Sequence, residues 1–366
     1  MSKGNDNTGL TAAKINKKDE FYTRIEDIQR EVSDYKKHFK NKVVYCNCDD
    51  PSASDFFQYF SLNFEALELK KLISSCYRNQ EWNLFSDNKS EKAVYLVYEG
   101  DKNNNRIPDP EEIGIKEFEG DGDFRSDESI ELLKQADIVV TNPPFSLIRE
   151  YIAQLIEYKK KFIIIAKLTV VKDKDIFPLL YENKMWLGNG FQGDAGHFKN
   201  STYENYTASG EKIDGTIRVP GVIWLTNLKN SRMEKELPLF KKYNKQEFPK
   251  FDNYDAIEVN SRNNIPEDYK GVMAVPITFI QKHNPKQFEL IGVTNGRDEF
   301  GAKPTKKYIN PKQHKDGVIS NGSKINTNAA LLHKDKPKGI YYTADNADGY
   351  LESIYTRFLI KNKMLY

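Results

Sequence analysis

Cysteine is scarce in this 366-residue sequence, which contains only Cys46, Cys48 and Cys76. A low, odd number argues against a secreted domain held by disulfides and for free thiols in a reducing cytoplasm. No second Cys or His pair follows Cys46 and Cys48 at the spacing of a metal site. We therefore expect packing thiols and no bound metal.

Long apolar runs are missing as well. No stretch approaches the ~20 apolar residues that a membrane-spanning helix needs, so we expect a cytoplasmic protein with no membrane partner. Residues 1–17 are mostly polar and predict a flexible leader rather than a targeting segment.

An excess of charge of either sign is also absent. The 55 basic and 53 acidic side chains leave a net charge of +2. This balance neither requires nor excludes nucleic acid, because a binding groove depends on local charge. Hydrophobic residues make up 39% of the chain and aromatic residues 12%, which is enough for a substantial core.

Short apolar runs rich in β-branched residues alternate with helix-like stretches. This alternation predicts an α/β fold with a doubly wound, mostly parallel sheet covered on both faces. The runs cover residues 43–46, 69–73, 138–140 and 162–165, and the helix-like stretches cover 54–64, 128–135 and 147–158. A hairpin insertion is expected near residues 93–118.

The character of the chain changes in its second half. Residues 185–330 are rich in Asn, Gly, Lys and aromatics and have little helical periodicity. We read them as the last strands of the sheet followed by a loop-rich recognition region. The predicted domains are a leader (1–17), a catalytic domain (18–228) and a C-terminal target-recognition region (229–366).

The strongest chemical signal is the segment Asn142-Pro143-Pro144-Phe145, which follows a buried strand. Two prolines stiffen the turn and withhold their own N–H donors. The turn then offers the Asn142 side-chain oxygen and the Pro143 carbonyl at the carboxyl edge of the sheet, where ligands bind. Two acceptors suit an exocyclic amine, since accepting both hydrogens localises the nitrogen lone pair. If this amine belongs to a nucleic-acid base, Phe145 would stack on that base, which must be lifted out of the duplex. The alternative is an ordinary turn between strand and helix.

This motif resembles the catalytic motif of amino-methylating DNA methyltransferases. Together with residues 47–51 and 120–125, it is similar to the EcoRI-type adenine methyltransferase family, from about residue 17 to the C-terminus. The resemblance implies a methyltransferase (Rossmann-like) fold and a site-specific DNA adenine N6-methyltransferase. It also implies that S-adenosylmethionine donates a methyl group to a flipped adenine in double-stranded DNA, in restriction-modification or epigenetic marking. A cognate restriction endonuclease, where one exists, would act as a separate protein.

The resemblance also implies cofactor-binding residues. The segment Phe21, Tyr22 and Thr23 would close over the methionine end of the cofactor; the alternative is a helix start capped by Thr23. Asp123 and Phe124 would meet the adenine, one accepting from its amine and the other lying on its face. Here the alternative is a solvated acidic turn.

One departure from the family pattern is the absence of a glycine-rich loop after the first strand, where glycines let the backbone approach the cofactor. Asn47 and Asp49 stand near that position, so we expect them to contact the cofactor by side chain. The acidic residue expected after the second strand is also missing, and Ser74-Ser75-Cys76 occupies its place.

Other patterns admit two readings. Residues 101–112 have calcium-loop offsets but lack the turn glycine, so a solvated hairpin tip is expected. Phe191 and Phe198 are either a clamp for the flipped base or core aromatics. A lysine-rich stretch either follows a DNA backbone or simply solvates the surface; it comprises Lys303, Lys306, Lys307, Lys312, His314 and Lys315.

Rival functions remain open from the sequence. The same turn suits adenine in RNA or a glutamine amide in a protein, although such enzymes often carry Tyr at the position of Phe145. Rivals of another class are a catalytically silent DNA-binding subunit and a restriction nuclease. The sequence does not support a nuclease function, because Asp109, Glu112 and Lys116 do not have the spacing of a nuclease metal site.

Overall fold

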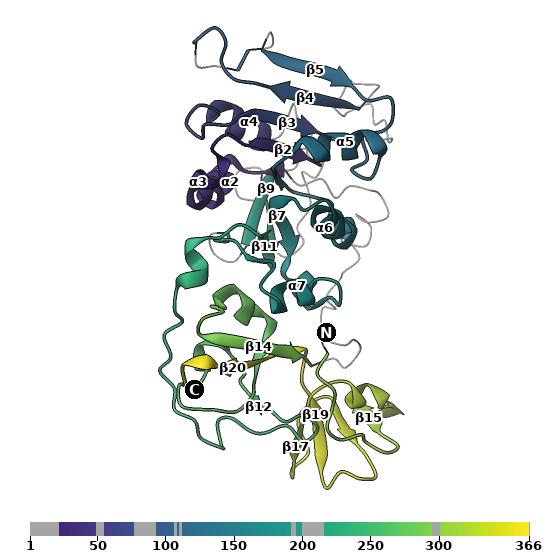
Figure 1. Cartoon of the computed structure of the whole chain (residues 1–366). Helices are drawn as coiled ribbons and strands as arrows, with labels where there is room; N and C mark the ends of the chain where they lie inside the picture. Colours follow the sequence, from purple (N-terminus) through teal and green to yellow (C-terminus); the bar gives the residue numbers. More distant parts are fainter. Residues whose placement is uncertain are drawn as a thin grey trace. The chain divides into compact units, whose positions relative to one another are not determined.

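The computed structural model describes residues 22–48, 55–76, 93–105, 108–109, 112–191, 195–199, 216–294 and 301–365. The chain divides into two compact units (Figure 1). Unit 1 comprises Met1–Leu168 and Met185–Asn230, and unit 2 comprises Thr169–Lys184 and Ser231–Tyr366. Within the described residues, no helix is both long and apolar enough to cross a membrane.

An eight-stranded mixed sheet dominates unit 1, with strand order β5-β4-β3-β2-β6-β7-β11-β8. The four central strands, β3, β2, β6 and β7, run parallel, and the flanking pairs are antiparallel. The strands are β2 (Val43–Asn47), β3 (Lys71–Ser75), β4 (Val94–Tyr98), β5 (Ile113–Glu117), β6 (Ile138–Thr141), β7 (Lys161–Lys167), β8 (Trp186–Leu187) and β11 (Val222–Thr226). The expected α/β class is confirmed, but the sheet is mixed, because antiparallel strands extend both of its edges.

Helices pack on both faces of this sheet (Figure 1). One face, with Val44 and Val140, shares a buried core with helices α2 and α4. Side chains alternate along a strand, so Asn47 points to the opposite face, where the Tyr151 hydroxyl on α6 meets it. Each fully buried apolar side chain in such layers contributes about 1.5–3 kcal/mol. The helices are α2 (Ile25–Val32), η1 (Ser33–Tyr35), α3 (Lys36–Phe39), α4 (Asp55–Leu62), α5 (Asp127–Gln135), η2 (Phe145–Leu147) and α6 (Ile148–Glu157).

A second, three-stranded sheet in unit 1 has the order β1-β9-β10, with β1 (Tyr22–Thr23), β9 (Ala195–Lys199) and β10 (Thr216–Pro220). The buried carboxylate of Asp55, at the start of α4, ties this sheet to the helices. It accepts from the Ile25 backbone nitrogen at 2.9 Å and pairs with the Lys199 ammonium at 2.8 Å. A buried carboxylate requires such partners, so Asp55 fixes where the chain enters α2.

Unit 2 is built mainly from strands. Its two sheets have the orders β12-β13-β20-β14 and β16-β15-β18-β19-β17. The strands are β12 (Ile257–Glu258), β13 (Met273–Pro276), β14 (Phe288–Val293), β15 (Lys312–Lys315), β16 (Val318–Asn321), β17 (Ala330–His333), β18 (Tyr341–Thr343), β19 (Tyr350–Ser353) and β20 (Arg357–Asn362). The helical turns are α7 (Phe177–Tyr181), η5 (Ser231–Glu234), η6 (Arg262–Asn264), η7 (Ile277–Lys282), η8 (Ser323–Asn326) and η9 (Lys363–Leu365), while η3 (Leu168–Lys172) spans the boundary. Unit 2 contains more regular strands than the sequence predicted. These strands were missed because they are too short to show a clear alternation of apolar and polar residues.

Candidate active site

The carboxyl edge of the parallel strands gathers the polar residues of unit 1. Asn47 ends β2, Ser75 ends β3, Thr141 ends β6 and Lys167 ends β7. Parallel strands deliver their last residues to one edge, which is the usual ligand-binding edge of an open α/β sheet. Asn47, Ser75 and Thr141 are buried there.

The turn Asn142-Pro143-Pro144 joins β6 to η2 at this edge. The Asn142 side chain is only 8% exposed. Pro144 has extended backbone angles, φ −56° and ψ 122°, and its carbonyl accepts from the Leu147 nitrogen at 3.0 Å. The hydrogen bond that closes the turn therefore uses the Pro144 carbonyl rather than that of Pro143. The result is a rigid, buried amide directly after a core strand.

Phe145 follows the turn and is partly buried against the core. The Lys167 ammonium lies 5.5 Å from the centre of its ring. A cation over an aromatic face is attractive by about 0.5–1 kcal/mol at exposed sites and more where water is excluded. The last residue of β7 therefore restrains the ring that follows β6.

Tyr151, on α6, links two of the expected cofactor residues. Its hydroxyl donates to the Asn47 side-chain oxygen, and its ring meets the Phe124 ring edge-on at 5.1 Å. Burial raises the pKa of Tyr151 well above its ordinary value, so the hydroxyl remains a neutral donor. Gln154 also donates to the Phe124 carbonyl at 3.0 Å. Helix α6 thus holds both Asn47 and the loop that carries Phe124.

Asp123 is engaged by Arg125. Its carboxylate accepts from the Arg125 backbone nitrogen at 2.8 Å and from the guanidinium at 2.9 and 2.7 Å. The guanidinium beside it lowers the pKa of Asp123 below its ordinary value, against a smaller opposing effect of burial. Arg125 also lies 5.3 Å from the centre of the buried Phe124 ring. The carboxylate is therefore ionised and oriented, and it is not a freely solvated acidic turn.

Thr23 lies in strand β1, paired opposite Phe198 of β9. The interpretation of Thr23 as a helix cap is wrong, because α2 begins at Ile25 with Arg24 at its N-cap. The Thr23 hydroxyl is buried and has no hydrogen-bond partner within the described parts of the chain. Tyr22 is the other residue of β1. Two further expected cofactor residues, Phe21 and Asp49, lie outside the described residues.

Three residues around this edge were missed in the sequence. Tyr151 reads as an ordinary core position, because it shares the apolar helical stripe of Ile148, Ile152 and Leu155. Arg125 and Lys167 read as surface charges. Only their proximity to Asp123 and Phe145 in the fold reveals a role.

Phe191 and Phe198 are core residues. Both belong to the main cluster of unit 1, and the Phe191 ring stacks on Trp224 at 5.5 Å. The interpretation of these rings as a clamp for a flipped base is therefore wrong.

The loop with calcium-like spacing, residues 101–112, uses a carboxylate for its own backbone: Glu112 accepts from the backbone nitrogens of Lys102 and Asn103. Across the described residues, no group of three His, Cys, Asp or Glu side chains could hold a metal ion.

The lysine-rich stretch lies in unit 2. Lys306 departs from its expected role as a phosphate contact, because its ammonium pairs with Asp252 at 2.9 Å and lies over the Tyr308 ring. Lys307, Lys312 and Lys315 are exposed.

Comparisons with known proteins show which proteins the chain resembles. A family model described as "Adenine-specific methyltransferase EcoRI" matches residues 9–363. Type II methyltransferase M.EcoRI from Escherichia coli is 49% identical over 306 residues, covering 82% of this chain and 93% of that protein. Type II methyltransferase M.MgeORF184P from Mycoplasma genitalium is 40% identical over 289 residues, covering 76% of this chain and 84% of the relative. Type II methyltransferase M.MpnI from Mycoplasma pneumoniae is 39% identical over 288 residues, covering 76% of this chain and 83% of the relative. No solved structure matches the chain.

Proposed function

Because the chain belongs to the EcoRI adenine-specific DNA methyltransferase family, we propose that it transfers a methyl group from S-adenosylmethionine to N6 of an adenine flipped out of double-stranded DNA. The chain is a type II adenine-specific DNA methyltransferase of restriction-modification systems. This membership decides against the RNA, glutamine, nuclease and silent-subunit alternatives.

The observation that carries the proposal is the buried Asn142 amide in the rigid turn after β6. In the proposed reaction its oxygen and the Pro143 carbonyl accept the two hydrogens of the adenine amine. These acceptors are fixed before the substrate arrives, so they stabilise the developing charge without reorganisation. Phe145, restrained by Lys167, stacks on the extruded base. After transfer, the methylated nitrogen carries a positive charge and loses one of its two hydrogens as a proton to water.

The chemistry of four further residues of unit 1 suits S-adenosylmethionine. The molecule is an ammonium carboxylate, a sulfonium and an adenosine. An ionised carboxylate (Asp123), a buried amide held by Tyr151 (Asn47), a ring (Phe124) and the buried Thr23 hydroxyl are suited to these parts. We assign Phe21, Tyr22 and Asp49 to the same role. When bound, the cofactor supplies an electrophilic methyl group, and the protein contributes position and electrostatics.

The wider architecture is part of the same proposal. The parallel strands β3, β2, β6 and β7 with helices on both faces support a doubly wound methyltransferase fold. Residues 18–228 would form the catalytic domain. Residues 229–366 would recognise the target DNA. As an enzyme of bacterial DNA, the protein would act in the cytoplasm, with any cognate restriction endonuclease acting separately.

The test is sequencing that detects modified bases in DNA from cells expressing the chain. We expect N6-methyladenine at one short recurrent motif with wild-type protein, far less with Asn142→Ala, and none with empty vector. Methylation of cytosine, or no methylation by a folded and expressed wild-type chain, would overturn the proposal.

A further inference from the structure

Positive charge is concentrated in one segment of unit 2. Residues 301–340 contain nine lysines and two aspartates, with no arginine or glutamate, whereas the whole chain has a net charge of only +2. Lys306 is neutralised by Asp252. Lys307, Lys312 and Lys315 are exposed and form no ion pair with any residue that the structure describes. A local field of this kind favours a polyanion.

Strands β15 and β16 of this segment form an antiparallel hairpin, and every residue of β16 is exposed. Asp316 and Gly317 form its turn with positive φ angles of 50° and 81°, as a tight two-residue hairpin turn requires. Strand β16 is the edge of its sheet. Its Val318 and Ile319 side chains are 65% and 61% exposed. An uncovered apolar edge strand is typical of a surface that binds a partner.

One face of this ribbon carries a row of side chains suited to contact with bases. Ile319 lies opposite His314, and His314 lies opposite Tyr341 on β18. The His314 and Tyr341 rings stack at 4.6 Å with an angle of 5° between them, and the His314 Nε2 lies 3.0 Å from the Thr343 hydroxyl. The other face of β18 is the core side, where Tyr342 is buried. The row is therefore held by the sheet, with Ile319 exposed and the His314 and Tyr341 rings half-buried.

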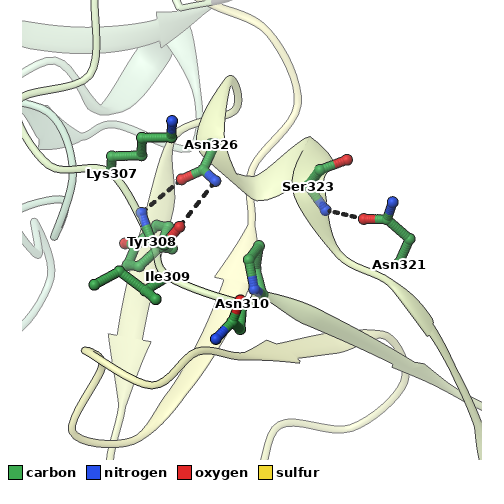
Figure 2. A pocket seen from close by; sticks show the side chains of 8 residues that line it. Lys307, Tyr308, Ile309, Asn310, Asn321, Ser323 and Asn326 are labelled. Carbon is green, nitrogen blue, oxygen red and sulfur yellow. Dashed lines mark hydrogen bonds between the residues drawn. The ribbon is translucent and has the colours of Figure 1, made fainter.

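An open cavity of about 740 Å³ adjoins the base of the hairpin. Figure 2 shows its lining, with Asn326 bonded to both the backbone nitrogen and the carbonyl of Tyr308. The Asn321 side-chain oxygen accepts from the Ser323 nitrogen at 2.8 Å. Lys307 also lines the cavity. Tyr308 is therefore fixed, and lysine, amide and hydroxyl donors border the cavity.

We propose that this hairpin surface reads the recognition sequence of duplex DNA; it comprises Lys307, Lys312, His314, Lys315, Ile319 and Asn321. A two-stranded ribbon fits the major groove, where an apolar side chain can contact a thymine methyl group and an asparagine amide can pair with adenine. The lysines contact flanking phosphates, which give affinity without sequence information. A second copy of the chain is a poorer occupant of this edge, because it would bring two such basic segments together. The inference rests on the proposed function, for which it supplies the specificity element.

The test compares two kinds of variant in the full-length protein. Ile319→Ala and Asn321→Ala remove base contacts, and Lys312→Gln/Lys315→Gln removes phosphate contacts. Lys36→Gln/Lys37→Gln is the matched control, since these two lysines on α3 are also exposed and form no ion pair within the described regions. Fluorescence anisotropy measures affinity, across a salt series, for a duplex with the methylated motif and for a scrambled duplex.

We expect each base-contact variant to lower the ratio of specific to scrambled affinity ~5–100-fold with little change for the scrambled duplex. The lysine variant should weaken both duplexes alike and reduce the salt slope by about 2, and the control should match wild type. Unchanged ratios and slopes in variants with wild-type melting temperatures would overturn the inference. Loss of a wild-type dimer in the Ile319→Ala variant, seen by sedimentation, would instead assign this edge to protein association.

The inference and the proposed function fail separately. If wild type methylates adenine at one motif and the variants keep the same motif preference, only the reading role of the hairpin is wrong. If wild type methylates no adenine, the proposed function itself is wrong.

Discussion

The Lys167 ammonium lies 5.5 Å from the centre of the Phe145 ring. This contact links the ends of two neighbouring parallel strands, β6 and β7, at the carboxyl edge of the sheet. The ring also packs, partly buried, against the core of unit 1. The contact therefore prepares the face on which the flipped adenine is proposed to stack.

Replacing Lys167 with Met should loosen Phe145 and weaken capture of the extruded base about 2–12-fold, the range of one cation–π contact of about 0.5–1.5 kcal/mol. Fluorescence of 2-aminopurine at the target position measures the extrusion. Lys167→Arg keeps the cation and should stay near wild type. Equal extrusion by the Met and Arg variants would show that the cation does not restrain the ring.

The Tyr151 hydroxyl fixes the Asn47 side chain by a buried hydrogen bond. Tyr151→Phe should lower the free energy of unfolding by about 1–3 kcal/mol, because a buried acceptor loses its donor. It should also weaken S-adenosylmethionine binding, since Asn47 would no longer be held. Denaturant unfolding and calorimetry measure the two effects. A stability loss with unchanged cofactor affinity would remove Asn47 from the cofactor site.

Asp123 and Arg125 can be separated by paired variants. Asp123→Ala should weaken the binding of S-adenosylmethionine by about 1–3 kcal/mol through loss of a charge-assisted hydrogen bond. Arg125→Gln removes the partner guanidinium but leaves the carboxylate, so its effect should be smaller. Titration calorimetry above pH 6 keeps the Asp123 carboxylate ionised both in the wild type and in Arg125→Gln. If Arg125→Gln costs as much as Asp123→Ala, the carboxylate acts only by holding its own loop.

His283 should make unit 2 sensitive to acid. Burial lowers the pKa of His283 to about 4, with its Nε2 3.2 Å from the Phe288 carbonyl oxygen. The unfolded chain, with a histidine pKa of about 6.5, binds the proton first, so stability is lost as pH falls from about 6.5 to 4. Between pH 7.5 and pH 5 this loss is about 2 kcal/mol. In His283→Gln the pH dependence of unfolding should shrink by that amount, and an unchanged dependence would contradict the assignment.

The sequence predicted the strands that carry the catalytic edge better than it predicted unit 2. The runs at 43–46, 138–140 and 162–165 coincide with β2, β6 and β7, because strands buried on both faces read as unbroken β-branched runs. The run at 69–73 overlaps β3 but begins two residues before it. Strands such as β15 and β16 are exposed and four residues long, so they have no apolar pattern to find. Contacts between distant segments, as in Tyr151 with Asn47, have no local signal.

The most direct test of the account is the single-turnover rate of methyl transfer by Asn142→Ala on a duplex with the mapped motif. The account predicts a rate ~10²–10³-fold below wild type, as for the loss of one preorganised hydrogen bond at a reacting centre, with S-adenosylmethionine affinity nearly unchanged. Asn142→Asp, which keeps a side-chain oxygen, should retain more activity than the alanine variant. A near-normal rate for Asn142→Ala would contradict the acceptor role and leave the buried turn after β6 as structure alone.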